Sequence, residues 1–234
     1  MKILVTGATG FIGSALIEYL ANIQGCTVVA MVRLEKDFDI STVVEFRLGE
    51  VGSLTKTDIN LFDIDVIIHT AARVHIMNDR SSNPIEEFRR VNTTGTLDLA
   101  RLAAASGVKR FVFLSSIKVN GEMTKPGQCF TPNDVYVPDD PYGLSKYESE
   151  QGLLALAKET GMEVVIIRPP LVYGPGVKAN FSSMMKWMGR PVPLPFGAIY
   201  NQRSLVALDN LVSFISLCAD REKSLEAANQ VFLI

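Results

Sequence analysis

Long apolar runs and paired cysteines are both missing from this chain. No apolar run approaches the roughly 20 residues that a membrane-spanning helix needs, so we expect no transmembrane segment. The chain begins directly in a strand-like run, without the pattern of a signal peptide. Its three cysteines, Cys26, Cys129 and Cys218, lie far apart and fit neither a disulfide framework nor a metal-ligand spacing. We therefore expect no metal site and a reducing, cytoplasmic location.

An excess of charge of one sign is absent as well. The formal net charge is −2 over 234 residues, and no long basic block occurs, so nucleic acid is not an expected partner. What the chain does have is apolar content. Hydrophobic residues make up 47% and charged residues 21%, which is enough to bury a large core. The length suits one large α/β domain, or one domain with a small lobe.

Short apolar segments alternate with helical patterns along the chain. The apolar segments are rich in Val, Ile and Phe without a polar alternation, as strands buried on both faces of a parallel sheet should be. The expected strands are residues 2–6, 27–33, 43–48, 66–69, 110–115, 163–168 and 230–234. The expected helices are residues 11–22, 84–106, 142–160, 181–188 and 209–220. We therefore predict an α/β fold with a Rossmann-like, doubly wound parallel sheet.

Two regions interrupt this alternation. Residues 120–140 form a long polar segment, and residues 169–205 are rich in proline. Long loops in a compact domain are usually functional, and ligands of open α/β sheets lie beyond the carboxyl ends of the strands. We expect residues 1–168 to form a dinucleotide-binding domain, and residues 169–234 to combine a small substrate lobe with returning sheet elements. Because the chain ends on a strand pattern, we expect a C-terminal part of this lobe to be missing.

A glycine-rich turn follows the first expected strand and opens the first expected helix. Gly7 permits the tight turn, Gly10 lets the backbone approach a pyrophosphate, and Gly13 allows close packing of helix on strand. The helix N-terminus then offers free N–H groups to phosphates. A glycine pattern alone is weak, but here strand, turn, helix and second strand all follow in order. The expected cofactor contacts of this turn are Gly7, Thr9, Gly10, Phe11, Ile12 and Gly13.

The second expected strand ends in Arg33 rather than in an acidic residue. Asp or Glu at this place would bind the ribose 2′-OH of NAD, whereas an arginine can pair with a 2′-phosphate. This favours NADP slightly over NAD. The alternative is that Arg33 stacks on adenine or is solvated, while Asp37 or Asp39 serves the ribose.

Tyr142 and Lys146 are four residues apart, so on a helix they share one face. A lysine ammonium group beside a phenol favours the phenolate and lowers a tyrosine pKa that is normally about 10. A tyrosine with such a pKa can exchange a proton with a substrate hydroxyl group near neutral pH. Together with the glycine turn, the pair predicts an enzyme that holds a dinucleotide and transfers a hydride.

The ordered motifs of the chain resemble those of the extended short-chain dehydrogenases/reductases, in the NAD-dependent epimerase/dehydratase branch of nucleotide-sugar enzymes. The resemblance covers essentially the whole chain. It is carried by residues 6–13, 69–72, 92–96, 113–116, 142–146, 168–175 and 203–209. By this resemblance Ser116, Tyr142 and Lys146 are the expected catalytic residues, with Ser116 also contacting the substrate. Tyr142 and Lys146 also contact the cofactor.

The same resemblance implies further binding residues. Ala71 and Ala72 are expected to line the cofactor crevice, and Asn92 to lie near the nicotinamide, although Asn92 could equally satisfy a buried backbone group. Arg203 and Asn180 match residues that hold the substrate diphosphate. Their alternatives are a surface salt bridge for Arg203 and a helix N-cap for Asn180.

The resemblance predicts a UDP-sugar 4-epimerase-like enzyme that transfers a hydride reversibly at the sugar C4. A 4-keto-sugar-nucleotide reductase would use the same catalytic residues, and a non-catalytic dinucleotide sensor is a further alternative. Lys118, expected at the substrate pocket, stands where the family usually has a small residue. Asn120 and Leu171 depart from the common pattern nearby, so the sugar stays open. A homodimer is expected by analogy with relatives, through the helices at 84–106 and 142–160.

Overall fold

The computed structural model describes residues 1–33, 44–52, 60–74, 83–125, 127–177, 179–189 and 201–234. Its centre is a seven-stranded sheet in the order β3-β2-β1-β4-β5-β6-β9, in which every pairing is parallel. The strands are β1 (Lys2–Thr6), β2 (Thr27–Val32), β3 (Val44–Leu48), β4 (Val66–His69), β5 (Arg110–Leu114), β6 (Glu163–Arg168) and β9 (Val231–Leu233). The predicted α/β class with a doubly wound parallel sheet is confirmed.

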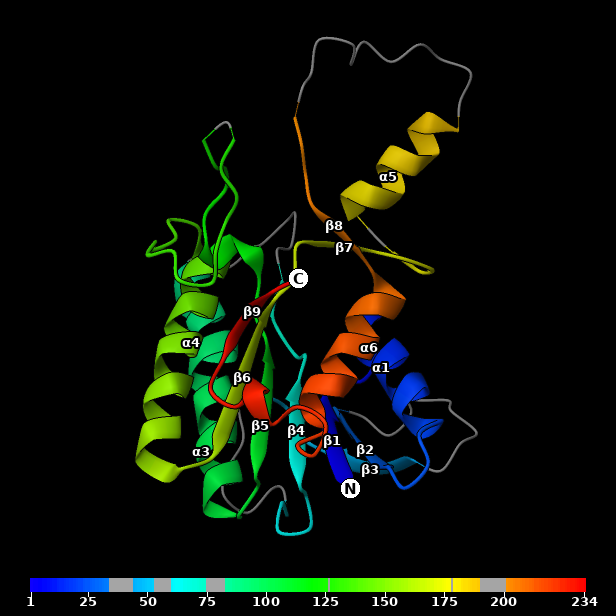
Figure 1. Cartoon of the computed structure of the whole chain (residues 1–234), viewed down its shortest axis with the longest axis vertical. Helices are drawn as coiled ribbons and strands as arrows, with labels where there is room; N and C mark the ends of the chain where they lie inside the picture. Colours follow the sequence, from blue (N-terminus) through cyan, green and yellow to red (C-terminus); the bar gives the residue numbers. More distant parts are fainter. Residues whose placement is uncertain (34–43, 53–59, 75–82, 126, 178, 190–200) are drawn as a thin grey trace.

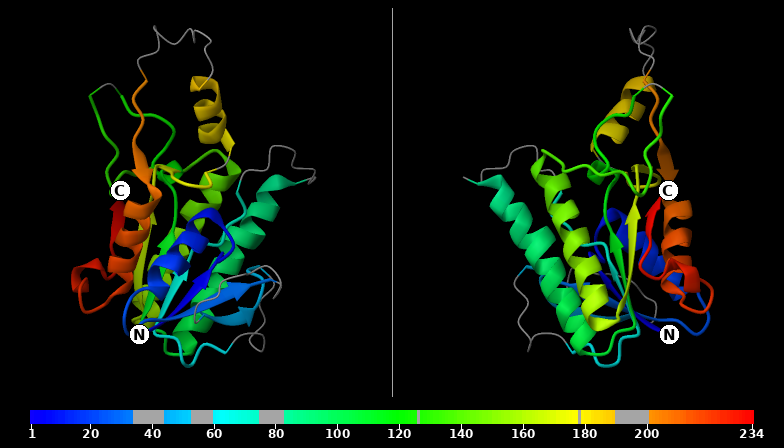
Figure 2. Two further views of the ribbon diagram at one scale, coloured as in Figure 1. Left: turned by 90° about the vertical axis from the view of Figure 1, so that its right-hand side faces the viewer. Right: turned by 60° about the vertical axis from the view of Figure 1, so that its left-hand side comes forward.

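Helices cover both faces of this sheet (Figures 1 and 2). One face carries α1 (Phe11–Ala21) and α6 (Leu208–Ala219), and the other carries α3 (Gly95–Ala105) and α4 (Pro141–Thr160). Neighbouring residues of one strand serve opposite cores: Ile3 packs with α1 and α6, whereas Leu4 packs with α3 and α4. This is why the strands are apolar without alternation.

The predicted helix over residues 84–106 is present but changes type along its length. It consists of α2 (Pro84–Phe88), a π-helical segment η2 (Arg89–Thr94) and α3. Gly95, at the start of α3, packs against the backbone of Gly52, and a Cβ atom added to it would lie 2.5 Å from Gly52 N. The predicted helix is confirmed from Pro84 to Ala105, but its middle turn is π-helical. A π-helical turn is rare and cannot be read from hydrophobic spacing.

A small lobe lies beyond the carboxyl ends of the strands (Figure 1). It contains α5 (Ala179–Met188) and a two-stranded parallel sheet of β7 (Leu171–Tyr173) and β8 (Leu205–Ala207), which the sequence analysis missed. The later elements α6 and β9 return to the main layers, since α6 packs on the sheet and β9 pairs with β6. The boundary at residue 168 stays a prediction. No helix within the described ranges is long and apolar enough to cross a bilayer.

Arg110 ties the sheet to the C-terminal part of the chain. Its side chain is fully buried at the start of β5. The guanidinium group donates to the carbonyl oxygens of Cys218 (2.7 Å) and Ser224 (3.0 Å), to Ser224 Oγ (2.9 Å) and to Glu163 Oε2 (2.7 Å). Glu163 also binds Arg221, whose side chain is 41% exposed. Two arginines thus share one carboxylate, and only one of them is buried.

We expect Arg110→Met to lower the free energy of unfolding by about 3 kcal/mol, because it leaves buried carbonyl groups without donors. Arg221→Met removes the other partner of Glu163 and should cost less than about 1 kcal/mol, since the side chain of Arg221 is 41% exposed. Denaturant titrations measure both free energies, and the comparison requires that the variants unfold with the same m-value. Equal losses for the two variants would contradict this account of the buried arginine.

Candidate functional site

The glycine turn is pressed against the end of β4. Gly7 has φ +68°, and a Cβ atom there would lie 2.7 Å from Ala71 N. A Cβ atom on Gly13 would lie 2.1 Å from the carbonyl oxygen of Gly7. At Gly10 an added Cβ would meet only Gly7 O, at 3.1 Å, and both Gly10 and Thr9 are exposed. Two glycines therefore close the turn, and the third leaves its outer side open to a ligand.

The first turn of α1 opens beside this surface. Gly10 is the N-cap residue, without a side-chain cap, and Phe11 and Ile12 are the first helical residues. No acidic side chain lies in the first turn, so the partial positive charge of the helix N-terminus is not offset there. An open glycine turn at such a terminus fits the pyrophosphate of a dinucleotide.

A buried hydrogen-bond chain fastens β1 to β4 below the turn. Ala71 N donates to Thr6 Oγ1 (3.2 Å), which is also bonded to His69 Nδ1 (2.7 Å). His69 Nε2 is bonded to Thr96 Oγ1 of α3 (2.9 Å). Burial, followed by the nearby charge of Lys146, lowers the pKa of His69 to about 3, so the ring is neutral. His69 was noticed in the sequence only as part of a motif, and the structure gives it this fastening role.

Ser116 and Tyr142 meet at the carboxyl edge of the sheet. Ser116 follows β5 and is the N-cap of the short 3-10 helix η3 (Ile117–Val119), where its Oγ accepts a hydrogen bond from Lys118 N (3.2 Å). Tyr142 lies in the first turn of α4, whose N-cap Asp140 accepts from Gly143 N (2.9 Å). The Ser116 side chain interacts with that of Tyr142 and lowers the pKa of the phenol. The predicted pair of hydroxyl groups is thus assembled.

Lys146 lies one turn further along α4 and is 1% exposed. Its ammonium group donates to the carbonyl oxygen of Leu114 (2.8 Å) and lies 4.5 Å from the ring centroid of Phe113. Burial lowers the pKa of Lys146 to about 7, although Glu150 opposes this shift. The structure therefore brings Ser116, Tyr142 and Lys146 to the end of one strand.

The predicted lowering of the tyrosine pKa by Lys146 is wrong for this arrangement. Desolvation in a partly buried site raises the pKa of Tyr142 to about 12. The interaction with Ser116 lowers it and the charge of Asp140 raises it, but both effects are smaller than desolvation. The ammonium group of Lys146 is directed at Leu114, so its proximity along the helix does not decide the tyrosine's charge.

Asn92 satisfies a buried backbone. Its Oδ1 accepts from Arg73 N (2.7 Å), and its Nδ2 donates to Arg73 O (3.0 Å) and Ser145 Oγ (3.0 Å). This is the second of the two roles foreseen for Asn92, and contact with a cofactor stays a prediction. Ala71 and Ala72, both half-buried, precede Arg73 at the end of β4. Asn92 thus holds the segment expected to line the cofactor crevice.

Lys118 lines a hollow of about 610 Å³ between η3 and the residues that precede α4. Its ammonium group pairs with Glu122 (2.9 Å) and Asp140 (3.8 Å), and both carboxylates raise the pKa of Lys118. The hollow is lined by Lys118, Asn120, Gly121, Glu122, Met123, Tyr136, Asp139 and Asp140. Neither Ser116 nor Tyr142 is among the lining residues, so a substrate contact of Lys118 stays a prediction.

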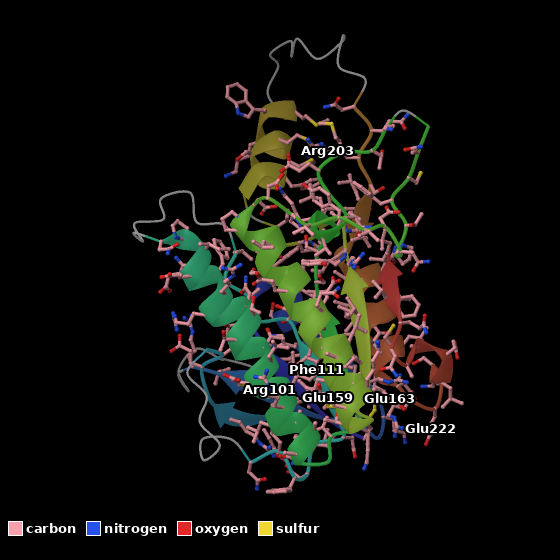
Figure 3. The ribbon with its side chains drawn as sticks, turned by 90° about the vertical axis from the view of Figure 1, so that its left-hand side faces the viewer. Arg101, Phe111, Glu159, Glu163, Arg203 and Glu222 are labelled. Carbon is pink, nitrogen blue, oxygen red and sulfur yellow. The ribbon has the colours of Figure 1, made fainter. Side chains whose placement is uncertain are left out.

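The remaining predicted binding residues lie apart from this cluster. Arg203 is exposed just before β8, at the end of the molecule that carries α5 (Figure 3). Asn180 lies in the first turn of α5 rather than at its N-cap, and its side chain is outside the described part of the structure. Arg33 is exposed just after β2. Asp37 and Asp39 fall outside the described residues.

Sequence reasoning missed a buried ion pair beneath the site. Glu150 of α4 is fully buried, and its Oε2 lies 2.6 Å from Nη2 of Arg168, which is 6% exposed. One signal was available, because Glu150 follows Lys146 by four residues and so shares its helix face. Arg168 was visible only as the first residue of a motif.

Comparisons with known proteins agree with this geometry. The sequence model of the NAD dependent epimerase/dehydratase family matches residues 3–233. The UDP-glucose 4-epimerase of Vibrio cholerae is 49% identical over 234 residues, which are 100% of this chain and 70% of that protein. The crystal structure of UDP-glucose 4-epimerase from Thermotoga maritima with UDP-glucose has a TM-score of 0.79 at 26% identity, covering 100% of this chain and 76% of that one. MoeE5 in complex with UDP-glucose and NAD gives 0.77 at 28% identity, covering 100% and 76%.

The buried lysine predicts a pH-dependent stability. Folded Lys146 loses its proton near pH 7, whereas the unfolded chain keeps it up to about 10.5, so the unfolded state binds more protons in between. The free energy of unfolding should therefore rise with pH, by about 1.4 kcal/mol per unit from this group. We expect Lys146→Met to remove that rise between pH 7 and 9, below the range where the buried Cys218 titrates.

Denaturant titrations of the protein without added ligand, at several pH values, measure this slope. Lys158→Met, at an exposed lysine of the same helix, is the matched control and should keep the wild-type slope. A slope that is the same in Lys146→Met and Lys158→Met would contradict the assignment.

Proposed function

The chain belongs to the NAD-dependent epimerase/dehydratase family, and from this membership we propose that it is a nucleotide-sugar 4-epimerase acting on UDP-linked hexoses. One observation carries the proposal. The side chains of Ser116 and Tyr142 interact at the end of the strand whose carbonyl group holds Lys146. The 49% identity to a UDP-glucose 4-epimerase supports the same reaction and substrate class.

NAD or NADP is the proposed cofactor. When bound, it supplies a hydride acceptor and, in its oxidised form, a positive charge that favours the phenolate. The glycine turn from Gly7 to Gly13, with Thr9, Phe11 and Ile12, would hold the pyrophosphate. Ala71 and Ala72 would line the crevice, and Lys146 and Tyr142 would lie at its reactive end.

The proton transfers fall to Tyr142. Its phenolic oxygen takes the proton of the sugar C4 hydroxyl group as C4 is oxidised, and returns that proton when C4 is reduced on the opposite face. The Ser116 hydroxyl group holds the same C4 oxygen. Atoms and electrons balance over one turnover, so the epimerase consumes neither cofactor nor external reductant.

Positive charge decides when Tyr142 can act as a base. With a pKa raised to about 12, its phenol is protonated at neutral pH. The ammonium group of Lys146 is bonded to the carbonyl oxygen of Leu114, so the positive charge that favours the phenolate would come from the oxidised cofactor.

The rest of the nucleotide sugar would bind towards the lobe. Arg203 is exposed and carries the planar fork that suits a diphosphate. Asn180 is proposed beside it, and Lys118 at the hollow that it lines together with Asn120 and Asp140. A homodimer and a cytoplasmic location stay predictions.

The reaction test uses UDP-glucose and UDP-N-acetylglucosamine without added cofactor. We expect conversion to the 4-epimer, which NMR spectra of the sugar detect. Tyr142→Phe should lower kcat at least about 100-fold, because it removes the proton carrier, while cofactor binding survives. Tyr147→Phe, a half-buried tyrosine of the same helix, is the matched control.

Two results would contradict the proposed epimerase activity. One is stoichiometric NADPH consumption with a 4-keto-6-deoxy sugar nucleotide and no epimerisation, which identifies a ketoreductase. The other is cofactor binding without any turnover, which identifies a sensor.

Arg33 is proposed to pair with a 2′-phosphate and so to favour NADP. We expect Arg33→Ala to weaken NADP binding about tenfold, the loss of a charge-assisted hydrogen bond, and to leave NAD binding nearly unchanged. Titration calorimetry with both dinucleotides measures this, with Arg101→Ala at an exposed arginine of α3 as control. Equal losses for both dinucleotides would mean that Arg33 contacts the part they share.

A further inference from the structure

After Glu150 and Arg168 bond to each other in the core, both side chains still have donor or acceptor groups that need partners. Arg168 Nε donates to Glu150 Oε1 (3.0 Å) and Oε2 (3.2 Å), and Nη2 donates to Oε2 (2.6 Å). A buried ion pair is tolerated only where its remaining groups are also hydrogen-bonded. The partners that meet this need are informative, because they flank the catalytic serine.

One partner precedes Ser116 and the other follows it. Ser115 Oγ donates to Glu150 Oε1 (2.5 Å), and Arg168 Nη1 donates to Asn120 Oδ1 (3.0 Å). Asn120 is the C-cap residue of η3, the turn that Ser116 begins. A closed circuit results, which we call the serine ring: Ser115, Glu150, Arg168, Asn120 and the η3 backbone that leads back to Ser116.

The backbone of the ring is also fixed to β6. Ser115 N donates to Ile167 O (2.8 Å), and Ile117 N donates to Pro169 O (3.0 Å). Ser116 Oγ accepts from Lys118 N, so its own proton is available to Tyr142. The direction of the Ser116 hydroxyl group therefore depends on the geometry of η3, which the ring holds at both ends.

Asn120 also reaches into the loop that connects the two catalytic hydroxyl groups. Its Nδ2 donates to Thr131 O (2.7 Å), and Arg168 Nη1 donates to Pro132 O (3.3 Å). This loop ends at Asp140, the N-cap of the helix that carries Tyr142. One amide side chain thus joins the serine turn, the buried ion pair and the loop that leads to the tyrosine.

We propose that Ser115 and Asn120 are positioning residues, which act through the serine ring to aim the Ser116 hydroxyl group at Tyr142. The inference rests on the proposed epimerase function for its kinetic readout. Both side chains are buried and bond to Glu150 or Arg168, and Asn120 also borders the hollow that Lys118 lines.

Loss of the ring should alter the ionisation of Tyr142. The interaction with Ser116 lowers the pKa of Tyr142, so a displaced Ser116 raises it. The acid limb of the kcat profile, which reports the phenolate, then moves to higher pH. The other groups around the tyrosine ring and its helix turn would be unchanged in the variants: Asp140, Lys118, Lys146, and Phe88 with Arg73 above its ring.

The experiment compares Ser115→Ala, Asn120→Ala and the double variant of the full chain. Each single change should lower kcat about tenfold with little change in KM, because a displaced catalytic group affects the reaction more than binding. The double variant should resemble the worse single one, since both changes open the same ring. Asn133→Ala in the exposed part of the loop and Ser213→Ala on α6 are matched controls.

Asn120→Asp separates the two contacts of Asn120. An aspartate keeps an acceptor for Arg168 but cannot donate to Thr131 O, so most of the wild-type kcat should return. If Asn120→Ala does not fold, Ser115→Ala and Asn120→Asp together still test the serine ring.

A second readout needs no substrate. Hydrogen exchange of the Lys118 amide reports its bond to Ser116 Oγ, and it should accelerate in Ser115→Ala and Asn120→Ala but not in the controls. Faster exchange in a protein without epimerase activity keeps the ring and rejects the function. If the wild-type protein is active, any of three results contradicts the serine ring. These are exchange of the Lys118 amide at the wild-type rate in both variants, kcat losses that multiply in the double variant, and a fall in kcat without a shift of the acid limb.

Discussion

The parallel direction of the seven main strands is the constraint on which the site depends. In a parallel ladder all carboxyl ends meet at one edge, so residues far apart in the sequence become neighbours. The glycine turn after β1, Ala71 after β4 and Ser116 after β5 all lie at this edge. The hydrogen bonds between Thr6, His69 and Ala71 hold two of these ends in register.

Desolvation dominates the electrostatics of this edge. It holds Tyr142 as a phenol, lowers the pKa of Lys146 to about 7 and keeps His69 neutral. One pKa unit corresponds to about 1.4 kcal/mol, so these shifts exceed what a surface ion pair contributes. A protein that keeps such groups buried holds them poised for charge supplied by a ligand, which is a common property of functional sites.

The pair of Glu150 and Arg168 illustrates why a buried charge pair can be retained without a large gain in stability. Two desolvated charges gain little over an apolar replacement, but they demand partners in fixed directions. Here those partners are Ser115 and Asn120, on either side of Ser116. The directional hydrogen bonds of the ion pair therefore fix the geometry of the serine turn.

The sequence by itself determined the βαβ order, the glycine turn and the face shared by Tyr142 and Lys146, because each rests on spacing within one element. It did not predict β7 and β8, because each strand is three residues long and too short to show a hydrophobic period. The π-helical turn, the role of Asn92, the raised pKa of Tyr142 and the partners of Glu150 were decided only by the tertiary structure. Burial and hydrogen-bond partners come from residues distant in the chain, and local spacing carries no record of them.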